Sequence, residues 1–180
     1  MDKLQSVVVQ DLSYQMPIFK GKAVGHADAK VNILKEIQDT PKYGIKYPGI
    51  QLTDCDWHLR DSYPRKYWPH AFEAISPCMT KTGEEMDFDS WEIGAYWYQW
   101  YEQGDYHDWH IHGQSMFVGV YYVLLSINSP CVSFNWRGKK ESFDVEEGDV
   151  VIFPSYLRHR ASVNNTSDTK VILSFNIDYK

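Results

Sequence analysis

The chain has 180 residues, of which 43% are hydrophobic and 23% charged, a size and mixture that fit one globular domain and exclude a disordered or fibrous protein. Its 18 basic residues are scattered and outnumbered by 24 acidic ones; the resulting net charge of -6 argues against unaided binding to long nucleic acid. No stretch approaches the roughly 20 consecutive apolar residues of a membrane-spanning helix, so a soluble protein is expected.

Two helical regions are predicted in the first half of the chain. Residues 27–40 carry apolar side chains at three-residue steps, which is the spacing of one helical face. A second helical pattern covers residues 63–86, but Pro69 and Pro77 interrupt it. This second region is therefore predicted as two short helices or one broken helix.

From Trp91 onward the pattern changes to alternating and β-branched segments, separated by Gly, Pro and Asn turns. Such a pattern is typical of an antiparallel barrel or sandwich. We expect a single domain, 1–180, in which a helical and mixed front (1–90) packs on a β-rich core (91–180). The predicted fold class is mostly β with N-terminal helices. Strands are expected at residues 93–101, 116–126, 131–136, 150–153 and 170–177.

Three histidines of the β-rich half have the spacing of a metal site. His110 and His112 lie two residues apart, and residues two apart on a strand point to the same face, so both imidazoles can reach one cavity. His159 follows a glycine turn, a buried strand and Pro154, and it supplies a third ligand from a distant strand. Neutral imidazole suits iron, copper, nickel and zinc, so the ligand type leaves the metal open. For any one histidine alone, the alternative is a hydrogen-bonded core residue.

Two further polar residues lie close to this pair in the sequence. His107 is expected to flank the site. Asp108 is the nearest carboxylate that could enter the coordination shell in place of His112, and its spacing equally fits an outer partner that hydrogen-bonds a ligand imidazole. The other histidines lack such partners and are expected on the surface or in the core: His26, His58 and His70.

The segments around these histidines resemble a known family. In order and spacing they are similar to the iron(II)- and 2-oxoglutarate-dependent oxygenases, particularly the short jelly-roll members of phages and bacteria. They also resemble the two short cupin motifs, since Gly104 lies six residues before His110 and Gly148 six before Pro154. Both families share one fold, so the resemblance implies a double-stranded β-helix, a jelly-roll and cupin-like barrel. The similar segments are residues 101–104, 109–112, 117–123, 147–154, His159 and 170–176.

The resemblance implies an iron(II) ion held by His110, His112 and His159. In the family the second of these ligands is usually Asp or Glu, and here His112 stands in that position. The resemblance also implies 2-oxoglutarate as a co-substrate. A cation about ten residues beyond the third ligand usually holds its distal carboxylate, and Lys170 lies eleven residues beyond His159.

The residues expected to contact the co-substrate each have an alternative interpretation. Lys170 either binds a carboxylate through charge-assisted hydrogen bonds or is a solvated lysine near a strand start. Tyr101 matches a family position whose phenol hydrogen-bonds the co-substrate, or it is a core aromatic. Arg158 and Arg160, on the strand face opposite His159, are alternative carboxylate partners.

The predicted function is an Fe(II)- and 2-oxoglutarate-dependent dioxygenase that hydroxylates a small molecule or a side chain. The alternative is a cupin-like metalloprotein that binds, isomerises or oxidises a small molecule without 2-oxoglutarate. A third hypothesis is a jelly roll without catalysis, in which the histidines are structural. A substrate pocket lined by tryptophans is one interpretation of the aromatic content, and the two faces of ordinary strands are the other. The tryptophans concerned are Trp91, Trp97, Trp100 and Trp109.

Cysteine usage indicates the compartment. Cys55, Cys78 and Cys131 are odd in number and show no CxxC spacing, so neither a disulfide framework nor a zinc ribbon is expected. The cytoplasm is the expected location, which would be the host cytoplasm for a phage-encoded chain.

Overall fold

The computed structural model describes residues 17–41, 43–47, 50–59, 63–142 and 144–180. Its two helices are α1 (His26–Gln38) and α2 (Trp68–Glu85), and the other described elements are strands. The strands of the first half and of the following hairpin are β1 (Phe19–Lys22), β2 (Tyr43–Tyr47), β3 (Ile50–Cys55), β4 (Trp91–Tyr101) and β5 (Tyr106–His110). The later strands are β6 (Phe117–Leu124), β7 (Val132–Trp136), β8 (Lys139–Ser142), β9 (Asp149–Pro154), β10 (Arg158–Ala161) and β11 (Lys170–Tyr179).

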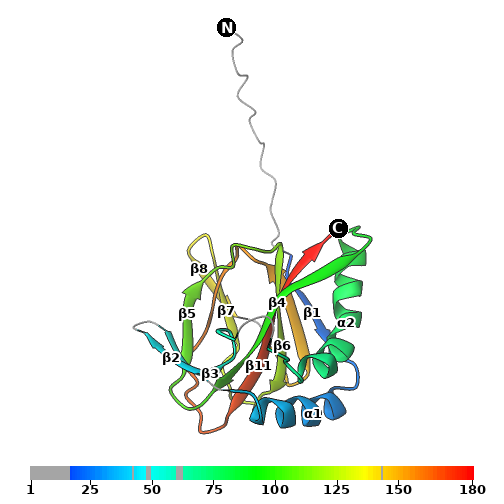
Figure 1. Ribbon diagram of the computed structural model, residues 1–180. Coiled ribbons are helices and arrows are strands. Elements are labelled where there is room, and N and C mark those ends of the chain that lie inside the picture. The colour runs from blue at the N-terminus through cyan, green and yellow to red at the C-terminus, as the bar shows by residue number, and fades with distance from the viewer. Residues whose placement is uncertain (1–16, 42, 48–49, 60–62, 143) are drawn as a thin grey trace.

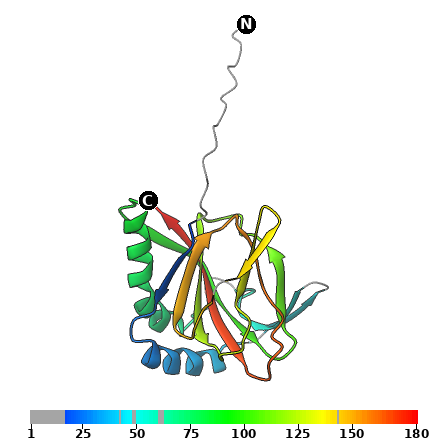
Figure 2. The ribbon, with the colours of Figure 1, turned by 180° about the vertical axis from the view of Figure 1, so that it is seen from behind.

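The strands form an antiparallel structure of two layers. Hydrogen bonds connect them in the order β1-β9-β6-β11-β4-β3-β5-β10-β7-β8, and β2 pairs with β3. The larger layer consists of β1, β9, β6, β11 and β4 and carries both helices on its outer side (Figures 1 and 2). The opposite layer consists of β5, β10, β7 and β8. Because β3 pairs with both β4 and β5, it joins the layers. The predicted jelly roll, mostly β with helices from the first half, is confirmed.

Side-chain alternation along the larger layer divides the interior into two cores. On β11, Leu173 and Phe175 face the helices, whereas Ile172 faces the space between the layers. On β6, Tyr121 and Tyr122 divide in the same way. Both faces of these strands are therefore buried, which explains their nearly continuous hydrophobic sequence. The even-numbered residues of β11 point toward the space in which the candidate site lies.

The side chain of Phe175 on β11 packs directly against Gly119 on β6. A Cβ atom added there would lie 2.2 Å from the ring of Phe175, so only glycine leaves room for this aromatic side chain under the helices.

The helices differ from the predicted pattern in one respect. Residues 68–85 form one helix that contains Pro77, where two short helices or one broken helix were expected. Pro69 lies in the first helical turn, where backbone N–H groups make no hydrogen bond within the helix, so the absence of an N–H in proline costs nothing there. Packing of the apolar face, with Ala71, Ile75 and Met79 in the core, outweighs the hydrogen bond lost at Pro77. Neither described helix is long and apolar enough to cross a membrane.

Each of the five predicted strands is present, with ends within two residues of those expected. The first ninety residues also contribute β1, β2 and β3, so this part of the chain belongs to the sheet as well as to the helical layer. The extent of the domain and its division at residue 90 stay a prediction.

Candidate metal centre

Two neighbouring strands and the segment that follows one of them bring three histidines together. His110 is the last residue of β5 and pairs with His159 on β10. His112 was expected on the same strand as His110, and this was wrong because β5 ends at His110. The backbone N–H of His112 instead donates a hydrogen bond of 2.9 Å to the carbonyl oxygen of Ser155, beyond the end of β9. This contact turns the chain out of the β5 ladder and directs His112 toward the other two rings.

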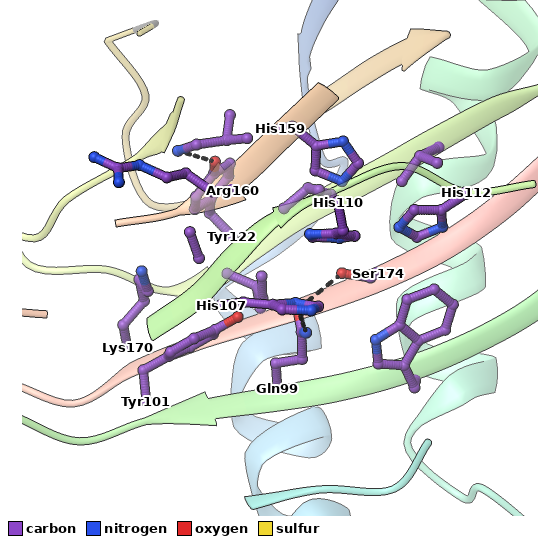
Figure 3. Close-up of a pocket in the computed structure, with 16 residues that line it drawn as sticks. Gln99, Tyr101, His107, His110, His112, Tyr122, His159, Arg160, Lys170 and Ser174 are labelled. Atoms are coloured by element: carbon purple, nitrogen blue, oxygen red, sulfur yellow. Dashed lines mark hydrogen bonds between the residues drawn. The ribbon is translucent and has the colours of Figure 1, made fainter. Parts of the chain in front are cut away.

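The three imidazoles converge between the layers (Figure 3). One potential ligand nitrogen from each of His110, His112 and His159 lies within 4.8 Å of the other two. The ring centroids are 4.2 Å apart for His110 and His159, and 5.2 to 5.3 Å apart for the pairs that include His112. Such a set of neutral nitrogen donors fits a divalent transition metal ion.

Each imidazole is oriented by an oxygen acceptor at Nδ1. His110 Nδ1 donates to the backbone carbonyl oxygen of Asp108 at 2.7 Å, and His159 Nδ1 donates to that of Leu157 at 2.8 Å. His112 Nδ1 donates to the side-chain Oδ1 of Asn176 on β11 at 2.9 Å. These bonds fix the proton on Nδ1 and leave the three Nε2 atoms as lone-pair donors, which is the usual arrangement of metal-ligating histidines.

Burial keeps these rings in the neutral form that a metal requires. It lowers the pKa of His110 to about 4 and that of His159 to about 2. It also lowers the pKa of His112, against the opposing effect of the Asn176 hydrogen bond. At neutral pH a cation therefore needs to displace no proton from the three rings.

A cavity extends from these histidines toward the end of the β4–β11 pair at which Tyr101 lies opposite Lys170 (Figure 3). Among the described residues, no Asp or Glu lines it. The polar side chains that line it, besides the three histidines, are Gln99, Tyr101, His107, Tyr122, Arg160, Lys170 and Ser174.

Lys170 is buried in this cavity instead of being solvated. Its side chain is 1% exposed, and burial lowers its pKa to about 8. Nζ donates a 3.1 Å hydrogen bond to the carbonyl oxygen of Pro130 and lies 4.4 Å from the centroid of the Tyr101 ring. No described carboxylate lies within ion-pair distance of it. A buried ammonium group with one carbonyl partner is a favourable place for an anionic ligand.

Tyr101 lines the same end of the cavity. Its side chain is completely buried, and burial raises the pKa of the phenol well above its usual range. Its hydroxyl group has no hydrogen-bond partner within the described part of the chain. A buried hydroxyl normally has a partner, so this group is available to a ligand of the cavity.

His107 lies beside the three histidines, as expected. Its ring stacks on that of His110, with centroids 3.9 Å apart and an interplanar angle of 16°. Burial lowers its pKa to about 3. Asp108, by contrast, is exposed, and its Oδ1 accepts a hydrogen bond from the backbone N–H of Trp109. Asp108 orients His110 through a hydrogen bond to its backbone oxygen, and its carboxylate is not part of the histidine cluster.

Of the remaining sequence candidates, two line the cavity and the others lie elsewhere in the fold. Trp97 lines the cavity and stacks on His112, with ring centroids 5.6 Å apart, whereas the other three tryptophans do not line it. Arg158 and Arg160 both stack on Trp109, and of the two only Arg160 borders the cavity. The histidines outside the cluster are His26, which hydrogen-bonds Tyr121, the exposed His58, and His70 on α2.

Three polar residues of the site were not singled out from the sequence: Gln99, Ser174 and Asn176. A signal for them exists in strand periodicity. Gln99 shares the face of Tyr101 on β4, and Ser174 and Asn176 share the face of Lys170 on β11. Polar residues at these buried positions could have been recognised as facing the interior of the barrel once Lys170 was a candidate.

Comparison of the sequence with protein-family models and with curated proteins gives no match. Comparison with solved structures does. A prolyl-4-hydroxylase from Pseudomonas putida aligns with a TM-score of 0.67 and 12% identity, over 92% of this chain and 94% of its own. A 2OG-Fe(II) oxygenase family oxidoreductase from Burkholderia pseudomallei aligns with a TM-score of 0.69 and 11% identity, over 89% and 85%.

A third similar structure is SnoN, a non-heme alpha-ketoglutarate-dependent epimerase from nogalamycin biosynthesis. It aligns with a TM-score of 0.70 and 11% identity, over 90% of this chain and 77% of its own. At this level of identity the comparisons establish the fold, which is that of the 2OG-Fe(II) oxygenases over nearly the whole chain.

Proposed function

We propose that the protein is an Fe(II)- and 2-oxoglutarate-dependent dioxygenase that hydroxylates a small molecule or a side chain. The observation that carries this proposal is that one cavity contains both a convergent histidine triad and a buried lysine without a carboxylate partner among the described residues. A metal site alone would fit many functions. The second, cationic end of the cavity adds a place for a dicarboxylate that spans from the metal to the lysine.

The residues have separate roles in this proposal. His110, His112 and His159 would hold Fe(II) through their Nε2 atoms, since each Nδ1 is already engaged. Bound Fe(II) supplies the redox centre at which O2 and 2-oxoglutarate are converted to succinate, carbon dioxide and an oxidant of the substrate. Lys170 would bind the distal carboxylate of 2-oxoglutarate, and the Tyr101 hydroxyl would donate a hydrogen bond to the same molecule.

The shared fold supports the assignment because the similar structures named above include a prolyl hydroxylase and an epimerase dependent on alpha-ketoglutarate. One departure from the family affects the chemistry: His112 occupies the position at which a carboxylate is usual. The three protein ligands are then neutral, so a bound ion keeps its full charge of +2. A more positive centre binds the anionic co-substrate more strongly and is harder to oxidise than a centre with one carboxylate ligand.

Anaerobic titration of the apo-protein with Fe(II) and 2-oxoglutarate tests the proposal. We expect a weak visible charge-transfer band that requires both additions. Lys170→Met should weaken 2-oxoglutarate binding by about tenfold or more, because it removes a charge-assisted partner from a buried carboxylate. Lys139→Met, at an exposed position on β8, is the control and should leave the titration unchanged. A spectrum without such a band for the wild-type protein would contradict the proposal.

The all-histidine ligand set favours a second candidate function. A metal centre of three neutral ligands can also bind, isomerise or oxidise a small molecule without a keto acid, as in the cupin-like alternative. This candidate uses the same histidines but makes no demand on Lys170. The cupin-like function would be favoured over the dioxygenase if Lys170→Met and Lys139→Met both still bind metal and Lys170→Met changes neither ligand affinity nor turnover.

A further inference from the structure

We propose that His107 donates a hydrogen bond from Nε2 to the metal-bound end of the anionic co-substrate, and that Gln99 and Ser174 hold it in the tautomer that can do so. This inference rests on the proposed function, which provides the co-substrate. It assigns a contact to a fourth imidazole of the cavity, one that the triad does not require.

His107 lies between the two ends of the cavity (Figure 3). Figure 3 shows its ring between Tyr101, at the cationic end of the cavity, and His110, in the histidine cluster. The ring lies flat against that of His110 at 3.9 Å and borders the cavity. A molecule that reaches from the metal to Lys170 therefore passes this imidazole.

His107 is not a fourth metal ligand. The group of nitrogens within 4.8 Å of one another contains His110, His112 and His159 and leaves His107 out. Its ring is parallel to that of His110, whereas ligands that share an ion direct their ring edges toward one point. His107 is therefore placed to contact a ligand of the metal, and not the metal itself.

Two hydrogen bonds in series connect the His107 ring to β4 and β11. Ser174 Oγ donates to Gln99 Oε1 at 3.2 Å, which orients the Gln99 amide. The Gln99 amide group then faces His107 Nδ1 at 3.3 Å and donates to it. With Nδ1 acting as the acceptor, the proton of the neutral ring lies on Nε2. This tautomer is the reverse of the one that the three triad histidines adopt.

Water does not readily replace these two hydrogen bonds. Gln99 is 3% exposed and Ser174 is 5% exposed, so both polar groups are inside the barrel. The His107 ring borders the cavity beside these groups, and a donor inside a protein normally has an acceptor. The oxygens of a metal-bound keto acid are acceptors of negative charge, and a hydrogen bond to a charged group is among the stronger kinds.

The experiment uses the full-length protein loaded with Mn(II) or Zn(II), which prevents turnover, and titrates it with 2-oxoglutarate. His107→Phe keeps a ring stacked on His110 and removes the donor. Gln99→Glu places a carboxylate that accepts a hydrogen bond from Nδ1–H, so that the proton of the ring lies on Nδ1 and Nε2 becomes an acceptor. We expect each variant to bind 2-oxoglutarate about tenfold more weakly, with metal affinity within about twofold of wild type. The exposed Gln103→Glu, which adds the same charge outside the cavity, is the control.

Two further readouts separate a contact from a structural role. The visible band of the anaerobic Fe(II) and 2-oxoglutarate complex should shift in His107→Phe, because a hydrogen bond to the co-substrate changes its energy. Nitrogen NMR of the wild-type apo-protein labelled at histidine reports the tautomer without any substitution, and it should find the His107 proton on Nε2.

The outcomes distinguish this inference from the proposed function. If the wild-type protein binds metal but no 2-oxoglutarate, the proposed function and the role of His107 are both wrong. If 2-oxoglutarate binding depends on Lys170, yet His107→Phe leaves the 2-oxoglutarate affinity and the visible band unchanged, only the proposed role of His107 is wrong. A parallel loss of metal affinity in His107→Phe, or a proton found on Nδ1, also overturns it.

Discussion

At the scale of single residues, the three candidate ligands differ in what holds them. His110 and His159 each donate Nδ1–H to the backbone carbonyl two residues earlier, a contact that no substitution can remove directly. His112, which lies outside the strands, depends on the side chain of Asn176. The candidate ligand His112 is thus the one whose orientation can be changed by a single substitution.

Asn176→Leu should lower the affinity for Fe(II) or Zn(II) by about 10- to 100-fold, because the His112 ring loses the acceptor that orients it. Asn176→Asp keeps an acceptor and adds a negative charge behind the ring, so its affinity should equal or exceed that of wild type. Competition with a chromophoric chelator measures both. The exposed Asn165→Leu is the control, and equal affinities for Asn176→Leu and wild type would show that His112 needs no such partner.

The buried histidines make the stability of the metal-free protein depend on pH. Burial lowers the folded-state pKa of His159 to about 2, whereas an unfolded imidazole titrates near 6.5. Below pH 6.5 the unfolded chain binds the additional proton, so stability is complete above this pH and is lost as the pH falls toward 2. His159 alone contributes a slope of about 1.4 kcal/mol per pH unit in this range. Urea unfolding of the apo-protein at pH 7 and pH 5 measures it, and His159→Gln should reduce the difference.

At the scale of elements, a buried ion pair fixes the start of α2 against the sheet. The carboxylate of Asp56, which is 0% exposed, accepts hydrogen bonds from Arg65 Nε at 2.9 Å and from the Tyr67 hydroxyl at 2.6 Å. It also accepts the backbone N–H of Tyr98 on β4 at 2.9 Å. The Asp56 side chain therefore connects the segment after β3 with the residue that precedes α2, Tyr67, and with β4, the strand that carries Gln99 and Tyr101.

Asp56→Asn should destabilise the protein by about 3–5 kcal/mol, since it leaves the buried Arg65 guanidinium without its counter-charge. Urea or thermal unfolding measures the change in free energy. Glu92→Gln provides the comparison: Glu92 pairs with Lys180 at 2.7 Å, but both side chains are largely exposed, so its loss should cost less than about 1 kcal/mol. Similar effects of the two substitutions would contradict the assigned role of Asp56.

At the scale of the whole molecule, the candidate centre connects the two layers of the barrel. His110 and His159 belong to the layer of β5 and β10, whereas Asn176 and Lys170 lie on β11 in the layer that the helices cover. Both helices pack on the outer side of that larger layer, which leaves the space between the layers for the cavity. A bound metal would thus hold together strands that are distant in the sequence.

Metal binding should therefore raise the thermal stability of the whole domain. A free metal concentration 100 times the dissociation constant stabilises the folded state by about 2.7 kcal/mol, and a chelator should reverse the gain. Thermal unfolding with and without Zn(II) or anaerobic Fe(II) measures the shift in Tm. His159→Ala should abolish the shift, while the exposed His58→Ala should keep it. A shift of equal size in both variants would point to metal binding elsewhere.

The sequence by itself determined the class of the fold and which histidines to consider. Strand periodicity is a local property, so five of the strands were predicted to within two residues, and the resemblance of the histidine segments to a known family implied the jelly roll, which was correct. Only the tertiary structure decided that the helical pattern continues through Pro77, that His112 leaves β5, and that Asn176, Gln99 and Ser174 surround the histidines. The His112–Asn176 and Gln99–Ser174 contacts join residues 64 and 75 positions apart in the chain, and their partners depend on the register of the whole sheet, which no local pattern encodes.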